Sequence, residues 1–238
     1  MGGYAGKILY IDLTSGNIET KPLDSKFARE YIGGLGFSTR IYLDLIKDKP
    51  EFDALSADNP FVLMTGPLTG MKMDAAARWT PGTKSPLTGL WGDSNIGGYF
   101  GAELKFAGYD GMVVTGNADK PTCIYIDDDT VRLRDANKYW GMDAYTANDE
   151  IIADYKGESK KSGQVLTIGP AGENLVRFAS LINKKGHAAG RTGVGAVWGA
   201  KKLKAIFVRG TGKLEAAHPH KLKNLREELK EVYDGNIT

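Results

Sequence analysis

Two glycine-rich stretches hold the residue types that could do chemistry. Residues 94–116 read SNIGGYFGAELKFAGYDGMVVTG, and residues 186–210 read GHAAGRTGVGAVWGAKKLKAIFVRG. Where a glycine-rich turn leads into a helix, unpaired backbone N–H groups and the positive end of the helix dipole meet at one spot. The missing Cβ atoms allow a ligand to touch the main chain there. The two stretches therefore predict two binding sites for phosphate groups.

Arginine side chains stand beside both stretches. Arg78 precedes the first stretch and Arg191 lies within the second, and a guanidinium can fork onto a phosphate or onto the edge of a planar heterocycle. A structural alternative stays open, because glycine clusters also form turns and close strand crossings, and single arginines often form surface ion pairs. Neither the P-loop spacing nor a complete dinucleotide-binding pattern occurs, so ATP and NAD are disfavoured.

The histidines offer one further candidate. His187 borders the second stretch and could donate a hydrogen bond to a ligand, although a histidine in a solvated turn is the alternative. His218 and His220 flank Pro219 at the start of the last predicted helix, and both are expected at the surface. No Ser-His-Asp or Cys-His arrangement is visible in the sequence.

The acidic residues and the single cysteine, Cys123, do not complete a catalytic or metal site. One cysteine forms no internal disulfide and cannot supply the four ligands of an iron–sulfur cluster. The run 127–129 (DDD) falls in a predicted hairpin turn, where its side chains point in different directions and where aspartate is common. Glu103 and Glu173 have no evident carboxylate partner. Catalytic groups are therefore not visible.

The elements that must position the two stretches occur twice in the same order. Each half is expected to contain a buried strand ending at Gly-Pro, a polar connection, a glycine-rich turn opening a short helix with lysine, and a strand ending in glycine. The two sets cover 61–67, 97–107 and 111–116, then 165–170, 193–204 and 205–210. We therefore predict an internal duplication. Further expected elements are hairpins at 6–23 and 122–135 and helices at 25–34, 38–47 and 143–155.

Composition limits the class of protein. The 238 residues are 42% hydrophobic and include 31 glycines, which is roughly twice the average usage, and the net charge is only +2 with basic residues spread along the chain. This balance argues against a nucleic-acid surface. The sequence has no apolar run long enough to span a membrane, and its N-terminus leads directly into a strand pattern without a secretory leader. A cytoplasmic protein is the resulting expectation.

The composition of the sequence changes near its end. Residues 219–235 form a charged helical pattern with Leu222, Leu225, Leu229 and Val232 on one stripe. We therefore expect a domain at 1–212, followed at 213–238 by a linker helix or the start of a helical domain.

Several ordered motifs carry a family resemblance. These are GPLTG, TKSPLTG, GGYFGAELKFAGYDGMVVTG, IGPAGENLVRFASLIN and GHAAGRTGVGAVWGAKKLKAI. Together they closely resemble the N-terminal domain of tungsten-dependent aldehyde:ferredoxin oxidoreductases over nearly all of residues 4–212. The resemblance implies an α+β, internally duplicated domain of two β-sheets related by a pseudo-twofold. That domain is a platform for two molybdopterin-type dithiolenes that hold one tungsten, or less favourably one molybdenum.

The resemblance also implies roles for particular residues. Arg78 is similar to an arginine that contacts a pterin, and the backbone carbonyls of Asn95 and Ala188 would bind the Mg²⁺ ion that bridges the two phosphates. The residues implied to line the pterins are Gly97, Gly98, Arg191 and Gly193. Relatives often carry an arginine beside the second loop, where this chain reads KKGHAAG. His187 or Lys185 is therefore expected to make that contact.

By the same resemblance, the complete enzyme oxidises an aldehyde with water to a carboxylic acid and passes two electrons through a [4Fe–4S] cluster to ferredoxin. The cluster cysteines and the acid–base residues belong to later domains, so this chain alone is expected to be inactive. Expected partners are ferredoxin, those later domains or subunits and a second copy of the chain. Two alternatives stay open: a relative acting on another substrate such as an acyl-CoA ester, and a non-catalytic module whose glycine loops are structural.

Overall fold

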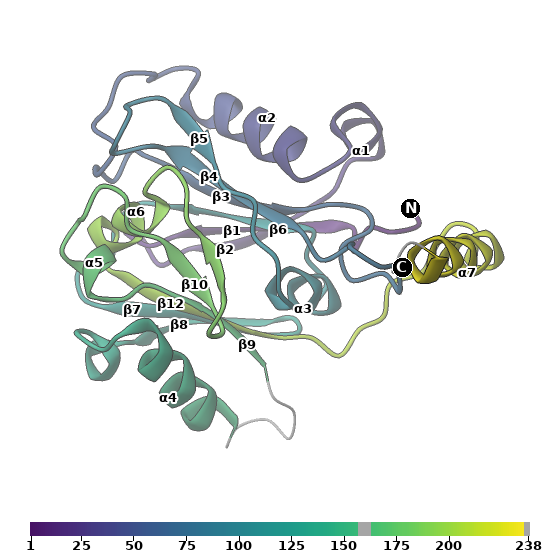
Figure 1. The fold of residues 1–238 in the computed structure, drawn as a ribbon. Coiled ribbons are helices and arrows are strands. Elements are labelled where there is room, and N and C mark those ends of the chain that lie inside the picture. The colour runs from purple at the N-terminus through teal and green to yellow at the C-terminus, as the bar shows by residue number, and fades with distance from the viewer. Residues whose placement is uncertain (157–162, 236–238) are drawn as a thin grey trace.

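The computed structural model describes residues 1–156 and 163–235. Two six-stranded sheets lie face to face, and their strand orders are β2-β1-β6-β3-β4-β5 and β8-β7-β12-β9-β10-β11. Figure 1 shows helices α1 and α2 outside the first sheet, α4 outside the second, and α3 and α6 between the two. The α+β, two-sheet class predicted from the sequence is confirmed.

The first half of the chain builds the first sheet. Its elements are β1 (Lys7–Asp12), β2 (Ile18–Pro22), α1 (Ser25–Tyr31), α2 (Leu35–Ile46), β3 (Phe61–Thr65), β4 (Trp79–Lys84), β5 (Trp91–Asp93), α3 (Phe100–Phe106) and β6 (Gly111–Thr115). The strands β1 and β6 are parallel, and all other neighbours in this sheet are antiparallel.

The second half repeats this plan. Its elements are β7 (Thr122–Asp127), β8 (Thr130–Asp135), the 3-10 helix η1 (Asn137–Tyr139), α4 (Ala144–Lys156), β9 (Gln164–Thr167), α5 (Pro170–Glu173), β10 (Leu181–Asn183), β11 (His187–Ala189), α6 (Val194–Ala200) and β12 (Leu203–Arg209). Here β7 and β12 are the parallel pair. Because strand order and pairing directions match between the halves, the predicted duplication is confirmed.

The main core lies between the sheets and follows from the alternation along each strand. In β1, Leu9 and Ile11 face the second sheet, while Ile8 joins a separate cluster under α1 and α2. In β12, Ile206 faces inward, while Phe207 packs under α4 with Tyr125 and Tyr155. Each sheet is therefore covered on both faces, which explains the nearly continuous apolar runs in the central strands.

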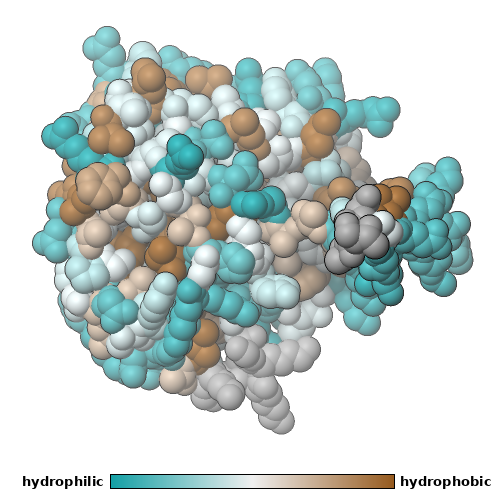
Figure 2. All heavy atoms as spheres, in the orientation of Figure 1, coloured by the Kyte–Doolittle hydropathy of each residue, from teal (hydrophilic) through white to brown (hydrophobic). Residues whose placement is uncertain are grey.

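The last helix, α7 (Pro219–Gly235), matches the predicted range and has no buried residue. It projects from the body in Figure 1, and Figure 2 shows it mostly teal with brown atoms where it meets the body. No described helix combines the length and the apolar character that crossing a membrane requires.

Three of the lysines that the structure describes are buried, and their amines cap backbone carbonyls at loop ends. Lys105 Nζ donates to Gly66 O at 2.8 Å, and Lys201 Nζ donates to Gly116 O at 2.9 Å. Lys204 Nζ donates to the carbonyl of Met142 at 2.9 Å and pairs with the carboxylate of Glu173. These bonds give each buried amine a partner and satisfy carbonyls of partly buried residues.

Burial lowers the pKa of Lys201 to about 8. An unfolded lysine has a pKa of about 10.4, so at this position the unfolded chain binds more protons between about pH 8 and about pH 10.4, and the contribution of Lys201 to the free energy of unfolding should rise with pH across that window. Denaturant unfolding at several pH values measures this slope. Lys201→Met should flatten it, by up to about 1.4 kcal/mol per pH unit, whereas Lys202→Met at the exposed neighbouring position should not. An unchanged slope in Lys201→Met would contradict the assignment.

Candidate functional site

The first glycine-rich loop is fixed by a single β-bridge. Trp79 and Ile96 exchange two backbone hydrogen bonds of 3.1 Å, one in each direction. The bridge is antiparallel, so it sets Arg78 directly opposite Gly97. The Oγ1 hydroxyl of Thr69 donates to the carbonyl of Arg78 at 2.7 Å and holds that residue from the other side. The charged side chain of Arg78, which precedes the loop in the sequence, is thus placed beside it.

Backbone donors in this loop are free. The N–H groups of Gly97, Gly98 and Tyr99 donate no hydrogen bond to any of the described residues. Gly98 has a φ of +86°, which glycine adopts without strain. The following helix is packed closely, since a Cβ at Gly101 would lie 2.6 Å from Cδ1 of the buried Trp79. The loop therefore presents main-chain donors above a rigid aromatic support.

The second loop is a tight hairpin between β10 and β11. Asn183 lies directly opposite His187, and the three residues between them form the turn. His187 and Ala188 are exposed, whereas Ala189 is buried. Arg191 is exposed as well, at the point where the chain leaves β11. Two lysines in the turn are also exposed, so this loop carries several positive charges.

The two loops contact each other at several residues. A Cβ at Gly98 would lie 2.8 Å from Cδ2 of His187, and a Cβ at Gly92 would lie 2.5 Å from Cγ2 of Thr192. The backbone N–H of Arg191 donates to Oγ of Ser94 at 3.2 Å. Residues predicted independently from the two halves therefore belong to one continuous surface.

This surface is cationic. Arg78 and Arg191 are exposed, and Nζ of Lys184 stands 4.9 Å above the ring of Tyr99. Lys185 forms an ion pair of 2.6 Å with Asp149 on α4. Free N–H groups, guanidinium groups and bare glycine backbone are the features that anionic ligands use. The residues present thus fit a ligand with phosphate groups.

The chain is similar in sequence to one family of known proteins. The sequence profile described as the N-terminal domain of aldehyde ferredoxin oxidoreductase matches residues 8–210. The chain belongs to this family. It is 45% identical, over 98% of its length, to the tungsten-containing aldehyde ferredoxin oxidoreductase of Pyrococcus horikoshii, and 43% identical, over 100%, to that of Pyrococcus furiosus. It spans 38% of the length of each of these two relatives.

The chain is also similar to proteins whose names describe other activities. The chain is 36% identical, over 98% of its length, to the WOR-like subunit of an aliphatic sulfonate oxidoreductase of Pyrococcus furiosus, of which it spans 39%. Among solved structures it is similar to the active-site complex BamBC of benzoyl-coenzyme A reductase bound to 1,5-dienoyl-CoA. The TM-score is 0.91 at 36% identity, covering 97% of this chain and 34% of the other. The fold is therefore shared across family members with different substrates.

The sequence-predicted site residues of this family member share one surface, with one difference in exposure. Asn95 and Ala188 are exposed and Gly97 is half-buried, but Gly193 is buried. A Cβ at Gly193 would overlap the carbonyl oxygen of Arg177. Gly193 therefore shapes the second loop from below, where the sequence alone suggested that it lines the ligand.

Sequence reasoning missed several residues at this surface. Ser94 and Thr192 connect the loops, and the side chain of Asn183 lies beneath Gly98. Arg177 is exposed in the segment before β10, and its carbonyl oxygen lies against Gly193 of the second loop. The repeated pair of arginine and aromatic residue, RW and RF, was the available signal for Arg177. No comparable signal marked the others.

The remaining candidates from the sequence have structural surroundings. Glu103 accepts from the N–H of Gly210 at 2.9 Å, and Glu173 accepts from that of Gly141 at 2.8 Å. Burial raises the pKa of the Cys123 thiol to about 12, so this thiol is not a nucleophile at neutral pH.

The aspartate run at the β7–β8 turn is divided among three partners. Its carboxylates contact Arg209, Thr211 and Lys7, in chain order from Asp127 to Asp129. His218 and His220 are exposed, as expected.

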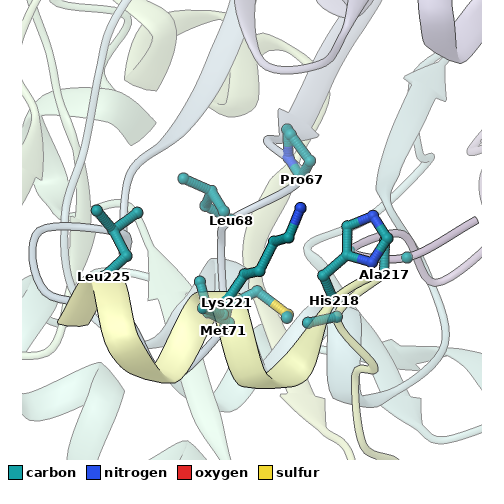
Figure 3. Close-up of a pocket in the computed structure, with 11 residues that line it drawn as sticks. Pro67, Leu68, Met71, Ala217, His218, Lys221 and Leu225 are labelled. Atoms are coloured by element: carbon teal, nitrogen blue, oxygen red, sulfur yellow. The ribbon is translucent and has the colours of Figure 1, made fainter. Parts of the chain in front are cut away.

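A hollow of about 300 Å³ lies away from the glycine loops, between α7 and the body. Figure 3 shows Leu68, Met71 and Leu225 around it, with the side chains of His218 and Lys221 at one side. Its lining is mainly apolar, and no predicted site residue contributes to it.

The close approach of the two loops predicts the effect of a small substitution. In Gly92→Ala, the new methyl group would overlap the Thr192 side chain, and overpacking of this kind costs about 1 to 3 kcal/mol. Gly186→Ala, in open space on the neighbouring hairpin, should change stability by less than about 0.5 kcal/mol. Chemical denaturation of both variants measures the difference. Equal stabilities would show that the loops separate without cost.

Proposed function

We propose that this chain is the cofactor platform of a tungsten enzyme that oxidises aldehydes to carboxylic acids with ferredoxin as electron acceptor. The observation that carries the proposal is the single cationic surface formed by glycine loops from both halves. The pairing of two equivalent loops suits a cofactor with two phosphate-bearing pterins. Family membership makes a tungstopterin the matching group.

The side chains are assigned by their position on that surface. Arg78 and Arg191 would bind pterin or phosphate edges through their guanidinium groups, and His187 would donate from the hairpin between them. Gly97 and Gly98 would offer free N–H groups to the same anions. In this arrangement the guanidinium, imidazole and N–H groups of this chain would neutralise the negative charges of the phosphates.

A magnesium ion is the second expected ligand. The backbone carbonyls of Asn95 and Ala188 are the assigned donors, one from each loop, because Mg²⁺ favours oxygen ligands and commonly binds together with phosphates. Both residues are exposed, and the Gly98–His187 contact joins the two loops that carry them. The ion would thus connect the halves as well as the phosphates.

The division of labour follows from what this chain contains. When bound, tungsten and its dithiolenes supply the electron-transfer chemistry, while the protein supplies position and electrostatics. A [4Fe–4S] cluster would be held by the rest of the enzyme, because the one cysteine here is buried in the second sheet. Ferredoxin as partner, a homodimer and a cytoplasmic location belong to the same proposal.

The domain division is proposed on packing. Residues 1–212 include both sheets and the packed core, whereas residues 213–238 include a helix with no buried residue. We assign that helix to the part of the enzyme that follows the platform.

A relative acting on another substrate is the second candidate. The structural match to a benzoyl-coenzyme A reductase complex favours it, with a TM-score of 0.91. The higher identity supports the aldehyde enzyme, at 45% against 36% for the complex. A non-catalytic module is disfavoured because the glycine loops leave N–H groups and arginines available to a ligand.

The direct test is composition of the full-length protein purified without oxygen. We expect about one tungsten and about two pterins per chain, measured by metal analysis and by fluorescence of the oxidised pterins, as the bis-pterin assignment requires. Ferredoxin reduction with aldehydes, compared with acyl-CoA esters, then separates the two enzymatic candidates. Protein that folds but carries neither tungsten nor pterin would support the non-catalytic module.

Replacing the arginines tests the assigned surface. Arg78→Ala and Arg191→Ala should each lower the pterin content of the full-length protein by about tenfold or more, because each removes a charged hydrogen-bonding group worth about 1.5 to 3 kcal/mol. Arg40→Ala is the matched control, since Arg40 is exposed on α2 and pairs with Asp44. The assignment fails if all three variants bind pterin equally.

A further inference from the structure

The side chain of Asn183 has a buried oxygen that the fold does not satisfy. Asn183 is fully buried on β10, and its Nδ2 donates to the carbonyl of Val165 at 2.8 Å. That bond fixes the orientation of the amide. The other end of the amide, Oδ1, has no hydrogen-bond partner within residues 1–156 and 163–235. A buried acceptor of this kind is costly and calls for a reason.

The oxygen points at the first glycine loop. A Cβ built on Gly98 would lie 2.5 Å from Asn183 Oδ1, so the Cα hydrogen in that direction points toward the oxygen. Only glycine has a hydrogen there, and a Cα–H group is a weak donor to such an oxygen. Asn183 therefore supports Gly98 from the opposite half of the molecule.

The same pair of residues holds Gly98 from a second side. Asn183 and His187 are directly opposite one another on β10 and β11, and the His187 ring would lie 2.8 Å from the same Cβ at Gly98. Two paired residues of the second half, Asn183 and His187, thus determine the position of the first glycine loop. The free N–H groups of Gly97, Gly98 and Tyr99 take their position from this contact.

We propose that Asn183 is a positioning residue that sets the spacing between the two glycine loops, and thereby the ability of the protein to hold both phosphate ends of its cofactor at once. The inference rests on the proposed function. Asn183 does not touch the ligand in this account. It acts through Gly98, whose main chain is proposed to contact the ligand.

The first experiment compares buried asparagines in the full-length protein. Asn183→Leu should increase the rate of pterin loss about tenfold or more, as for outer-shell partners of metal sites. Asn148→Leu is the control, because Asn148 is also buried with an Oδ1 that has no partner among the described residues, while its Nδ2 donates to its neighbour Asp149 and not to a glycine loop. Thermal unfolding is recorded for both. Equal pterin retention by the unaltered protein and Asn183→Leu overturns the proposal.

A double substitution separates positioning from general destabilisation. Gly98→Ala should reduce pterin content strongly, since its methyl group would overlap Asn183 Oδ1. Asn183→Ala removes that overlap, so the double variant should retain more pterin than the product of the two single effects predicts. Independent effects would show that Asn183 does not act through Gly98, and would overturn the proposal. If the unaltered protein folds but holds no pterin, the proposed function itself is wrong.

Discussion

The close contact between backbone and side chain across the two halves is the constraint on which the site depends. Gly92 and Gly98 have no side chain, and this lets Thr192, Asn183 and His187 of the other half approach them. A larger residue at either glycine would move the loops apart. The glycines that first indicated ligand binding thus have two uses. In the proposed function they bare the main chain to a ligand, and in the structure they let one half of the molecule touch the other.

The sheets supply the rigidity that such a contact needs. Each loop leaves a strand whose sheet is covered on both faces, and the two sheets share one core. Buried lysines close the ends of several loops by capping carbonyls, so positive charge is used inside the fold as well as on the surface formed by the glycine loops. The arginines, in contrast, remain exposed beside the glycines. Lysine and arginine therefore have separate tasks in this domain.

The apolar and periodic elements of the fold can be predicted well from the sequence. The short strands around the glycine loops cannot. The strands 61–65 and 111–115 and the helix 219–235 are apolar or periodic, and they were found. The sequence predicts polar connections where the structure has β4, β5, β10 and β11, because Pro81 and Gly82 interrupt β4 and the other three strands are only three residues long. Tertiary pairing, not local preference, makes them strands. The loop residues were found through their types and family motifs, whereas Asn183 could only be found through its packing.

The parallel pairing of the first strand of each half with its last has a consequence for how the chain reaches this structure. Ile8 pairs with Gly111, and Leu203 pairs with Thr122. The central strands of each sheet are thus joined only after the whole half has been synthesised, and closing so long a loop slows folding. During synthesis of the chain, the N–H and C=O groups along one edge of β1 therefore stay unpaired until β6 has been made.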